Sequence, residues 1–280
     1  MISYGGPWTE EKLRIIYNYL NTYTTVLKDR PFRLIYVDAF AGDGTWQPGS
    51  GYAPEDYREF TEILNGSAAR ALEVQDRPFD RLVFIEKSEE RSEILRRLVA
   101  RHPDRSIEVV TDDANLALPK FCASMGTFDR AVVFLDPYAT EVDWETVEAI
   151  AGTQKIDCWI LFPLMAITRM MPTENVPSDS LATHLDRVFG GNEHWRDFYQ
   201  ESSQLSLFGD APRHERPPGS ALIAGLYRKR LESVFTSVAP TPRTFRNSMN
   251  SPMFELFFGA ANPVGAKLAV PIADHILKHL

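Results

Sequence analysis

The sequence predicts a doubly wound α/β fold, in which a mostly parallel sheet lies between layers of helices. Short apolar segments of bulky or β-branched residues are typical of strands that are buried on both faces. Between them lie stretches with apolar residues at helical spacing. Strands and helices that alternate in this way imply right-handed crossovers and parallel pairing.

The first helix is predicted over residues 10–28, where Leu13, Ile16 and Leu20 fall on one face. It precedes the first strand, residues 34–37. The glycines after this strand permit a tight turn, in which main-chain NH groups can approach a ligand closely. Ligands bind to open α/β sheets at such carboxyl ends of strands.

Two further strands follow after an irregular connection. A Gly- and Pro-containing stretch at 45–65 and a short helix at 67–74 lead to the second strand, residues 81–85. Ser88 is the expected N-cap of the next helix, because its hydroxyl can accept a hydrogen bond from the first turn. The third strand is predicted at 107–110.

The second half of the chain continues the pattern. A strand is predicted at 131–135, a helix at 142–151 and a strand at 157–162. After an interruption the sheet is expected to resume with a strand at 253–260. A terminal helix at 265–279 would complete the fold.

The interruption, residues 163–220, contains Pro-, Ser- and Met-rich loops around short helices predicted at 181–189 and 194–201. We interpret it as an insertion or lid within a single domain that spans residues 1–280. A helix predicted at 221–238 would return the chain to the sheet.

Composition excludes several classes of protein. The chain has 280 residues, of which 44% are hydrophobic, and its two cysteines cannot form a disulfide framework or a Cys-rich metal site. A formal net charge of −8 argues against a broad basic surface for duplex nucleic acid. No apolar run approaches a membrane span, and residues 1–7 lack the features of a signal peptide. We therefore expect a cytoplasmic protein without membrane association.

Four consecutive predicted strands end in an acidic residue. These acids are Asp38, Glu86, Asp112 or Asp113, and Asp136. The carboxyl ends of parallel strands share one edge, so we expect the acids to converge on one crevice. A cofactor with ribose hydroxyls, an adenine amine and a positive centre would give them partners. S-adenosylmethionine has all three features.

Two other ligands compete with this interpretation. NAD is disfavoured because the turn at 42–44 lacks a third glycine, and because Glu86 lies well beyond the roughly 20-residue spacing of that fingerprint. A magnesium site built from Asp38, Asp112 and Asp136 is a further alternative, since hard cations need oxygen ligands.

The chain resembles the class I S-adenosylmethionine-dependent methyltransferases in the order of four motifs, LIYVDAFAGDG, VFIEKSEER, TDDAN and VVFLDPYATEVDW. More closely, it resembles the bacterial three-Cys-motif partner (TcmP) family over nearly its whole length, from the first helix to AKLAVPIADHIL. The resemblance implies a Rossmann-like methyltransferase fold and S-adenosylmethionine as cofactor. It also implies a neighbouring three-Cys-motif protein as partner.

The resemblance further implies a set of cofactor-binding residues, namely Asp38, Phe40, Gly42, Gly44, Glu86, Lys87, Asp112 and Asp113. In this set the first loop would hold the methionine side of the cofactor. Glu86 would accept hydrogen bonds from both ribose hydroxyls. Asp113, or alternatively Asp112, would face the adenine amine.

The segment Asp136-Pro137-Tyr138 resembles the Asp-Pro-Pro-Tyr signature of amino-group methyltransferases, with one proline missing. The signature implies that Asp136 orients an exocyclic amine and that Tyr138 stacks on a base of RNA or DNA. These three residues are therefore the expected catalytic residues. The alternative is that Asp136 caps the next turn and Tyr138 packs.

A second short motif lies in the interruption, at Gln204-Leu205-Ser206-Leu207-Phe208. It resembles the peptide by which bacterial replication and repair proteins dock on the DNA sliding clamp. Gln204, Leu205, Leu207 and Phe208 would make the contacts, unless the apolar side chains pack back onto the insertion. The alternative function is thus a non-catalytic protein that keeps the fold, works with the three-Cys-motif protein and docks on the clamp.

Overall fold

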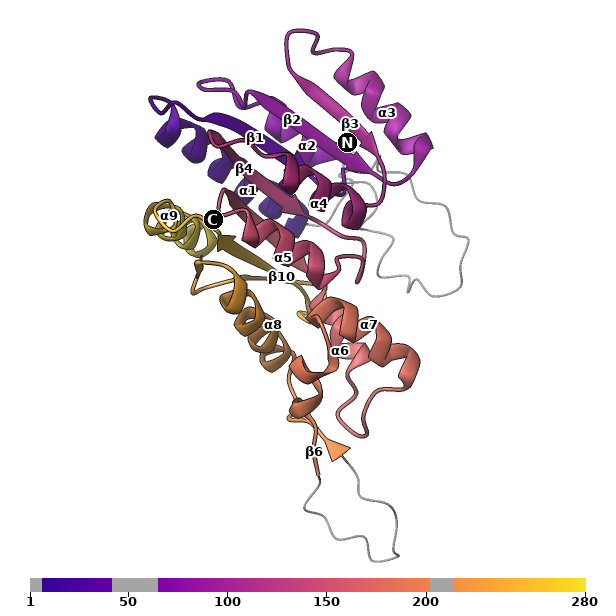
Figure 1. Cartoon of the computed structure of the whole chain (residues 1–280). Helices are drawn as coiled ribbons and strands as arrows, with labels where there is room; N and C mark the ends of the chain where they lie inside the picture. Colours follow the sequence, from indigo (N-terminus) through magenta and orange to yellow (C-terminus); the bar gives the residue numbers. More distant parts are fainter. Residues whose placement is uncertain (1–6, 42–64, 202–213) are drawn as a thin grey trace, which may run out of the picture.

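An eight-stranded sheet forms the centre of the protein (Figure 1). The computed structural model describes residues 7–41, 65–201 and 214–280. Within these residues the strand order is β3-β2-β1-β4-β5-β10-β8, and β9 pairs with β10. The arrangement confirms the predicted mostly parallel, Rossmann-like α/β fold.

The strands from β1 to β5 are parallel to one another. Their bounds are Arg33–Asp38 (β1), Arg81–Glu86 (β2), Ile107–Thr111 (β3), Asp129–Leu135 (β4) and Ile156–Phe162 (β5). One long strand, β10 (Pro252–Ala260), runs antiparallel between β5 and the short strand β8 (Ser237–Val238). The carboxyl ends of β1 to β5 therefore lie on one edge of the sheet.

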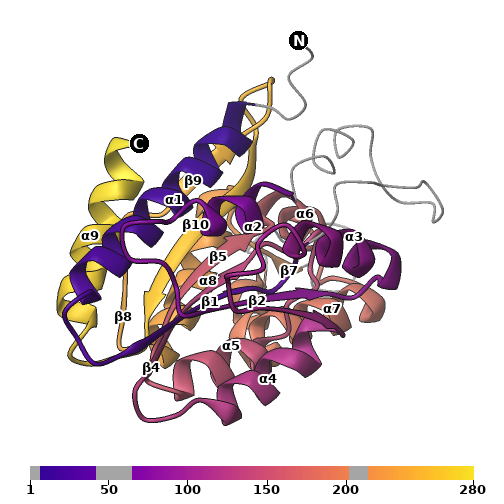
Figure 2. The same ribbon diagram turned by 90° about the horizontal axis from the view of Figure 1, so that it is seen from above.

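Helices cover both faces of the sheet (Figure 2). One face carries α1 (Pro7–Leu27), α2 (Asn65–Leu72), α3 (Glu89–Val99) and α9 (Ala266–His279). The other face carries α4 (Ala114–Ser124), α5 (Trp144–Gly152) and α8 (Ser220–Val234). None of the helices in the described part of the chain is both long and apolar enough to cross a membrane.

Alternate residues of each central strand serve the two helical layers. In β1, Ile35 and Val37 belong to the core on the α4 and α5 side, whereas Leu34 and Tyr36 belong to the core beneath α1 and α2. All four side chains are fully buried. This double burial explains why the strand is a continuous run of apolar residues.

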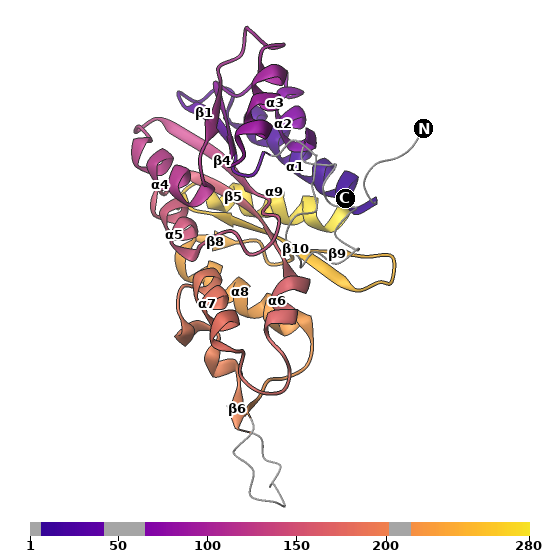
Figure 3. The same ribbon diagram turned by 90° about the vertical axis from the view of Figure 1, so that its right-hand side faces the viewer.

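The predicted insertion, residues 163–220, forms small elements that lie with α8 at one end of the molecule (Figure 3). They are α6 (Leu164–Met170), α7 (Asp179–Phe189), two single 3-10 turns at Asn192–His194 and Arg196–Phe198, and the strand pair β6 (Gln200–Glu201) and β7 (His214–Glu215). Aromatic packing joins them to the sheet. Phe162 of β5 stacks on Tyr227 of α8 at 4.2 Å between ring centroids, and Phe189 of α7 lies edge-on to both rings.

The structure corrects two predicted helices. The helix predicted at 194–201 is wrong. This segment contains a single 3-10 turn at Arg196–Phe198, and Gln200 after it is extended and pairs with Glu215 as part of β6 and β7. The helix predicted at 221–238 ends at Val234. Phe235 is extended, and Ser237–Val238 instead joins the edge of the sheet as β8.

Several elements were not predicted, among them a helix and a strand of the main sheet. The helix α4 follows Asp113 and buries Ala117, Leu118 and Phe121 against the sheet, although Pro119 lies inside it. The strand β9 (Arg243–Arg246) pairs with β10 and contains one buried residue, Phe245. Pro119 argues against a helix in α4, and β9 is short and mostly polar, so neither segment has the apolar pattern that predicts its structure.

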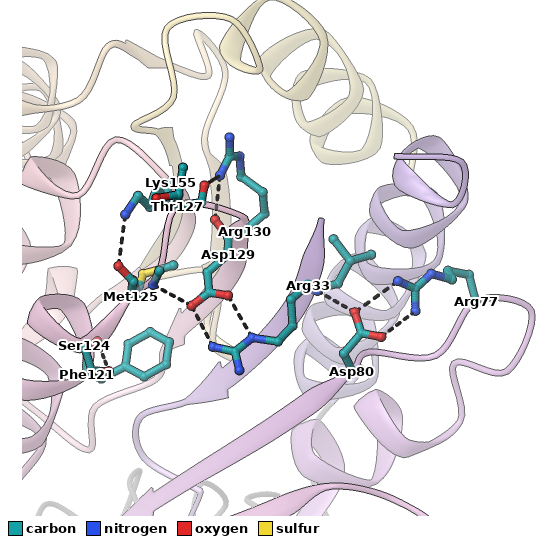
Figure 4. Close-up of polar contacts among 12 residues, drawn as sticks. Arg33, Arg77, Asp80, Phe121, Ser124, Met125, Thr127, Asp129, Arg130 and Lys155 are labelled. Carbon is teal, nitrogen blue, oxygen red and sulfur yellow. Dashed lines mark hydrogen bonds and ion pairs between the residues drawn. The ribbon is translucent and has the colours of Figure 1, made fainter. Parts of the chain in front are cut away.

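Ion pairs tie the strands together at their amino ends, the edge opposite the acidic residues (Figure 4). Both Nε and Nη2 of Arg33 in β1 donate to the Asp129 carboxylate of β4, each at 2.8 Å. The main-chain NH of Gly126 donates to the same carboxylate at 2.8 Å. The Arg33 guanidinium holds the pKa of Asp129 below its usual range.

We predict that Asp129→Asn lowers the free energy of unfolding by about 2 kcal/mol, because it breaks a bidentate pair at a buried carboxylate. Urea denaturation at pH 7 measures this difference. Since the pKa of Asp129 is lowered in the folded state, its contribution is lost as the pH falls through that pKa. The variant should therefore approach the wild type below about pH 4.

The matched control is Glu93→Gln, which removes an exposed charge paired with Arg96. We expect it to change stability by less than about 0.5 kcal/mol. A control effect as large as that of Asp129→Asn would contradict this account of the sheet edge.

Candidate cofactor and substrate site

A cavity of about 630 Å³ lies at the carboxyl ends of the parallel strands. This volume is typical of small-molecule sites, which range over roughly 300–1,000 Å³. Eight of the predicted site residues line it, namely Phe40, Glu86, Lys87, Asp112, Asp113, Asp136, Pro137 and Tyr138. The structure thus brings together residues that are far apart along the chain.

Glu86 ends β2 and is 6% exposed. Its Oε1 accepts a hydrogen bond from the main-chain NH of Ser88 at 2.8 Å, and Arg91 lies 3.9 Å from the same oxygen. Ser88 is the N-cap of α3, as predicted, and accepts from the NH of Arg91. The first turn of α3 therefore holds the Glu86 carboxylate in place at the cavity.

Asp112 and Asp113 follow β3, and each is paired with a lysine. Asp113 caps α4, accepts from the NH of Asn115 at 2.9 Å and accepts from Lys87 Nζ at 2.8 Å. Asp112 accepts from Lys120 Nζ at 3.0 Å. The adjacent lysines lower the pKa of both carboxyl groups, so both are ionised at neutral pH.

Asp38 ends β1 but, within the described part of the chain, it is fully buried and does not line the cavity. Its carboxylate accepts from the hydroxyl of Tyr36 and the NH of Phe40, both at 3.4 Å, and also bonds Ser67. Burial raises the pKa of Asp38 to about 7, and the nearby Asp136 charge adds to this rise. Asp38 therefore stabilises the start of the turn after β1, through its hydrogen bond with the NH of Phe40.

Asp136 follows β4 directly and is 7% exposed. Its Oδ2 accepts a hydrogen bond from Lys12 Nζ of α1 at 2.5 Å. Tyr138, two residues further on, is 42% exposed, and its NH donates to Glu141 Oε2 at 3.2 Å. The cavity is thus lined by a buried acid and an accessible aromatic ring from the same turn.

Some cavity residues were missed by sequence reasoning. Trp8 and Lys12 come from α1, Phe254 comes from β10, and His184 and Arg187 come from α7. A signal for Lys12 was available. It lies on the stripe of α1 that also contains Trp8, Ile15, Ile16 and Tyr19, and a lysine on a buried stripe needs a partner.

Other predicted residues lie outside the described residues. These are Gly42 and Gly44 of the first turn, and Gln204, Leu205, Leu207 and Phe208 of the docking motif. Among residues 7–41, 65–201 and 214–280, no group of three or more His, Cys, Asp or Glu side chains is arranged to hold a metal ion.

Comparison with solved structures shows which known folds this chain is similar to. The chain is similar to the Legionella pneumophila protein LPL1258, of the family described as DUF519, with a TM-score of 0.50 and 13% identity over 94% of this chain and 90% of that one. At this identity the likeness concerns the fold alone.

Two further similar structures are described as follows. An S-adenosylmethionine-dependent methyltransferase from Clostridium acetobutylicum has a TM-score of 0.37 and 7% identity over 91% of this chain and 92% of that one. The N-terminal domain of EvdMO1 with S-adenosylhomocysteine (SAH) bound has a TM-score of 0.38 and 14% identity over 88% and 81%. No protein-family model matches the sequence, and no curated protein matches it.

The raised pKa of Asp38 predicts a pH dependence of stability. Between about pH 4 and pH 7 the folded state binds a proton at Asp38 that the unfolded chain does not bind, so the free energy of unfolding falls as the pH rises. Between pH 5 and pH 8 we expect the free energy of unfolding to fall by about 2 kcal/mol less in Asp38→Asn than in the wild type. Urea denaturation of wild type and variant at the two pH values measures it.

One result would contradict this prediction. If the free energies of unfolding of wild type and Asp38→Asn change equally between pH 5 and pH 8, Asp38 does not titrate near neutrality. The reference variant is Asp104→Asn in the loop before β3, at an exposed position, which should leave the pH dependence as it is.

Proposed function

We propose that this protein is an S-adenosylmethionine-dependent methyltransferase that acts on an amino group of a nucleic-acid base or a nucleotide-like substrate. One observation carries the proposal. Carboxylates from the ends of β2, β3 and β4 line a single cavity of nucleoside size, together with the turn that contains Tyr138. The motif resemblance and the Rossmann-like sheet support the same conclusion.

The acids suit the adenosyl part of the cofactor. Glu86 is held by α3 with its carboxylate at the cavity, where it would accept hydrogen bonds from ribose hydroxyls. Asp113, or alternatively Asp112, would accept from the adenine amine. A carboxylate offers about four acceptor positions, so one that already accepts hydrogen bonds from the protein can also accept them from a ligand.

The remaining residues suit the reacting groups. S-adenosylmethionine, when bound, supplies a methyl group that is activated on a positively charged sulfur. Asp136 would accept a hydrogen bond from the amine and orient its lone pair, while the half-exposed Tyr138 ring would stack on the base. Catalysis of this kind rests on alignment and on electrostatic complementarity within the site.

Binding of the cofactor is the first test. Calorimetry with S-adenosylmethionine and with SAH should detect binding to the wild type. Glu86→Ala should weaken both by at least about tenfold, because hydrogen bonds to a buried carboxylate are lost. Glu108→Ala is the matched control, since Glu108 lies in β3 away from the cavity and pairs with Arg81. A wild-type protein that binds neither compound refutes the proposal.

The proposal includes the partners that the sequence suggests. The resemblance to the TcmP family implies that the protein acts with a three-Cys-motif protein, and the Gln204 to Phe208 motif would dock it on the DNA sliding clamp. The physical support is the motif itself, in which Leu207 and Phe208 are apolar anchors for a groove. The same docking would serve a non-catalytic protein with this fold.

A pulldown with purified sliding clamp tests the docking. We expect the clamp to be retained by the wild-type protein and lost with Leu207→Ala combined with Phe208→Ala, because the two anchors carry most of the binding energy. Leu222→Ala with Val264→Ala is the control, since it removes two exposed apolar side chains elsewhere. Equal retention by all three proteins would eliminate this docking site.

A further inference from the structure

Lys12 is a buried cation within the candidate site. It is 3% exposed and lies on α1, which precedes the first strand in the sequence. Its Nζ is 2.5 Å from Oδ2 of Asp136, a residue 124 positions further along the chain. Lysine is almost never fully buried unless it is paired, so the pair with Asp136 accounts for its position.

Aromatic rings hold the ammonium group of Lys12. Nζ lies 5.3 Å from the ring centroid of Trp8 and 5.8 Å from that of Phe134. The Trp8 ring in turn stacks on Phe254 of β10 at 5.4 Å. Elements from both ends of the chain therefore restrict the side chain, and the ammonium is directed at the Asp136 carboxylate.

A second buried acid, Asp38, lies near the pair of Lys12 and Asp136. Asp38 is fully buried and interacts electrostatically with both Asp136 and Lys12. Burial and the neighbouring Asp136 charge raise the pKa of Asp38. The positive charge of Lys12 offsets the repulsion between the two acids.

The contact uses only one oxygen of Asp136. Within residues 7–41, 65–201 and 214–280, Oδ1 of Asp136 has no hydrogen-bond partner, although the residue lines the cavity. Lys12 thus leaves one acceptor atom available to a ligand.

We propose that Lys12 is a positioning residue for methyl transfer, which holds Oδ2 of Asp136 so that Oδ1 receives the substrate amine. This inference rests on the proposed function. In the reaction the amine nitrogen bonds to the methyl carbon as the carbon–sulfur bond breaks and sulfur keeps the electron pair. The methylated amine then releases a proton to water. Because Oδ1 accepts from an N–H of the amine, the nitrogen lone pair stays free to attack the methyl carbon.

The test is Lys12→Met, which keeps the length of the side chain and removes its charge. The site becomes more negative by one unit, and this favours the cationic S-adenosylmethionine over the neutral SAH. We expect the ratio of their affinities, measured by calorimetry, to rise by about fivefold. A Lys12 charge that does not act on the ligand site would leave this ratio unchanged, even where the variant is less stable.

Turnover gives the second readout. Transfer of tritium from methyl-labelled S-adenosylmethionine to short single-stranded RNA and DNA should show kcat reduced by about 10²-fold in Lys12→Met, with KM for the cofactor not raised. Lys12→Arg, which keeps the charge, should restore the affinity ratio and part of kcat. Lys155→Met is the matched control, because Lys155 lies at the opposite edge of the sheet and donates to the Met125 carbonyl (Figure 4).

The outcomes separate the two proposals. A wild-type protein that binds neither compound overturns the proposed function, and the role of Lys12 falls with it. Wild-type binding together with an affinity ratio that is within twofold of wild type in Lys12→Met overturns the role of Lys12 alone. If Lys12→Met does not fold, Lys12→Gln is measured in the same way, with the same expected rise in the ratio.

Discussion

Parallel pairing of β1 to β5 is the constraint on which the site depends. Because these strands run in one direction, every carboxyl end reaches the same edge of the sheet, and residues dispersed from Phe40 to Tyr138 line one cavity. The opposite edge is held by Arg33 and Asp129, which join β1 to β4. Register fixed at one edge is transmitted to the other, since β1 and β4 are short and almost wholly buried.

Carboxylates that gather at one edge of the sheet repel one another, and most of them have a partner in the fold that offsets this repulsion. Lysines pair with Asp112 and Asp113, the first turn of α3 holds Glu86, and Lys12 pairs with Asp136. Asp38 makes no ion pair within the described residues, and burial raises its pKa to about 7. The charges of the cavity are therefore balanced before any ligand enters, which limits mutual repulsion.

Much of this could be predicted from the sequence, because strands buried on both faces leave a strong pattern. The fold class, the strands from β1 to β5 and the acids that follow them were inferred from such runs. The contributions of α1, α7 and β10 to the cavity could not be inferred in this way. Trp8, Lys12, His184 and Phe254 reach the cavity through tertiary packing, and periodicity along one element does not report which other element lies against it.

Two opposite kinds of segment contribute to the walls of the cavity. The strand ends and α3 come from a continuous stretch of alternating strands and helices, whereas His184 and Arg187 come from α7, inside the segment that interrupts this alternation. Replacing that segment would change one wall and leave the carboxylates of the other in place. The residues of α7 can therefore alter which molecules the cavity admits without displacing the carboxylates at the strand ends.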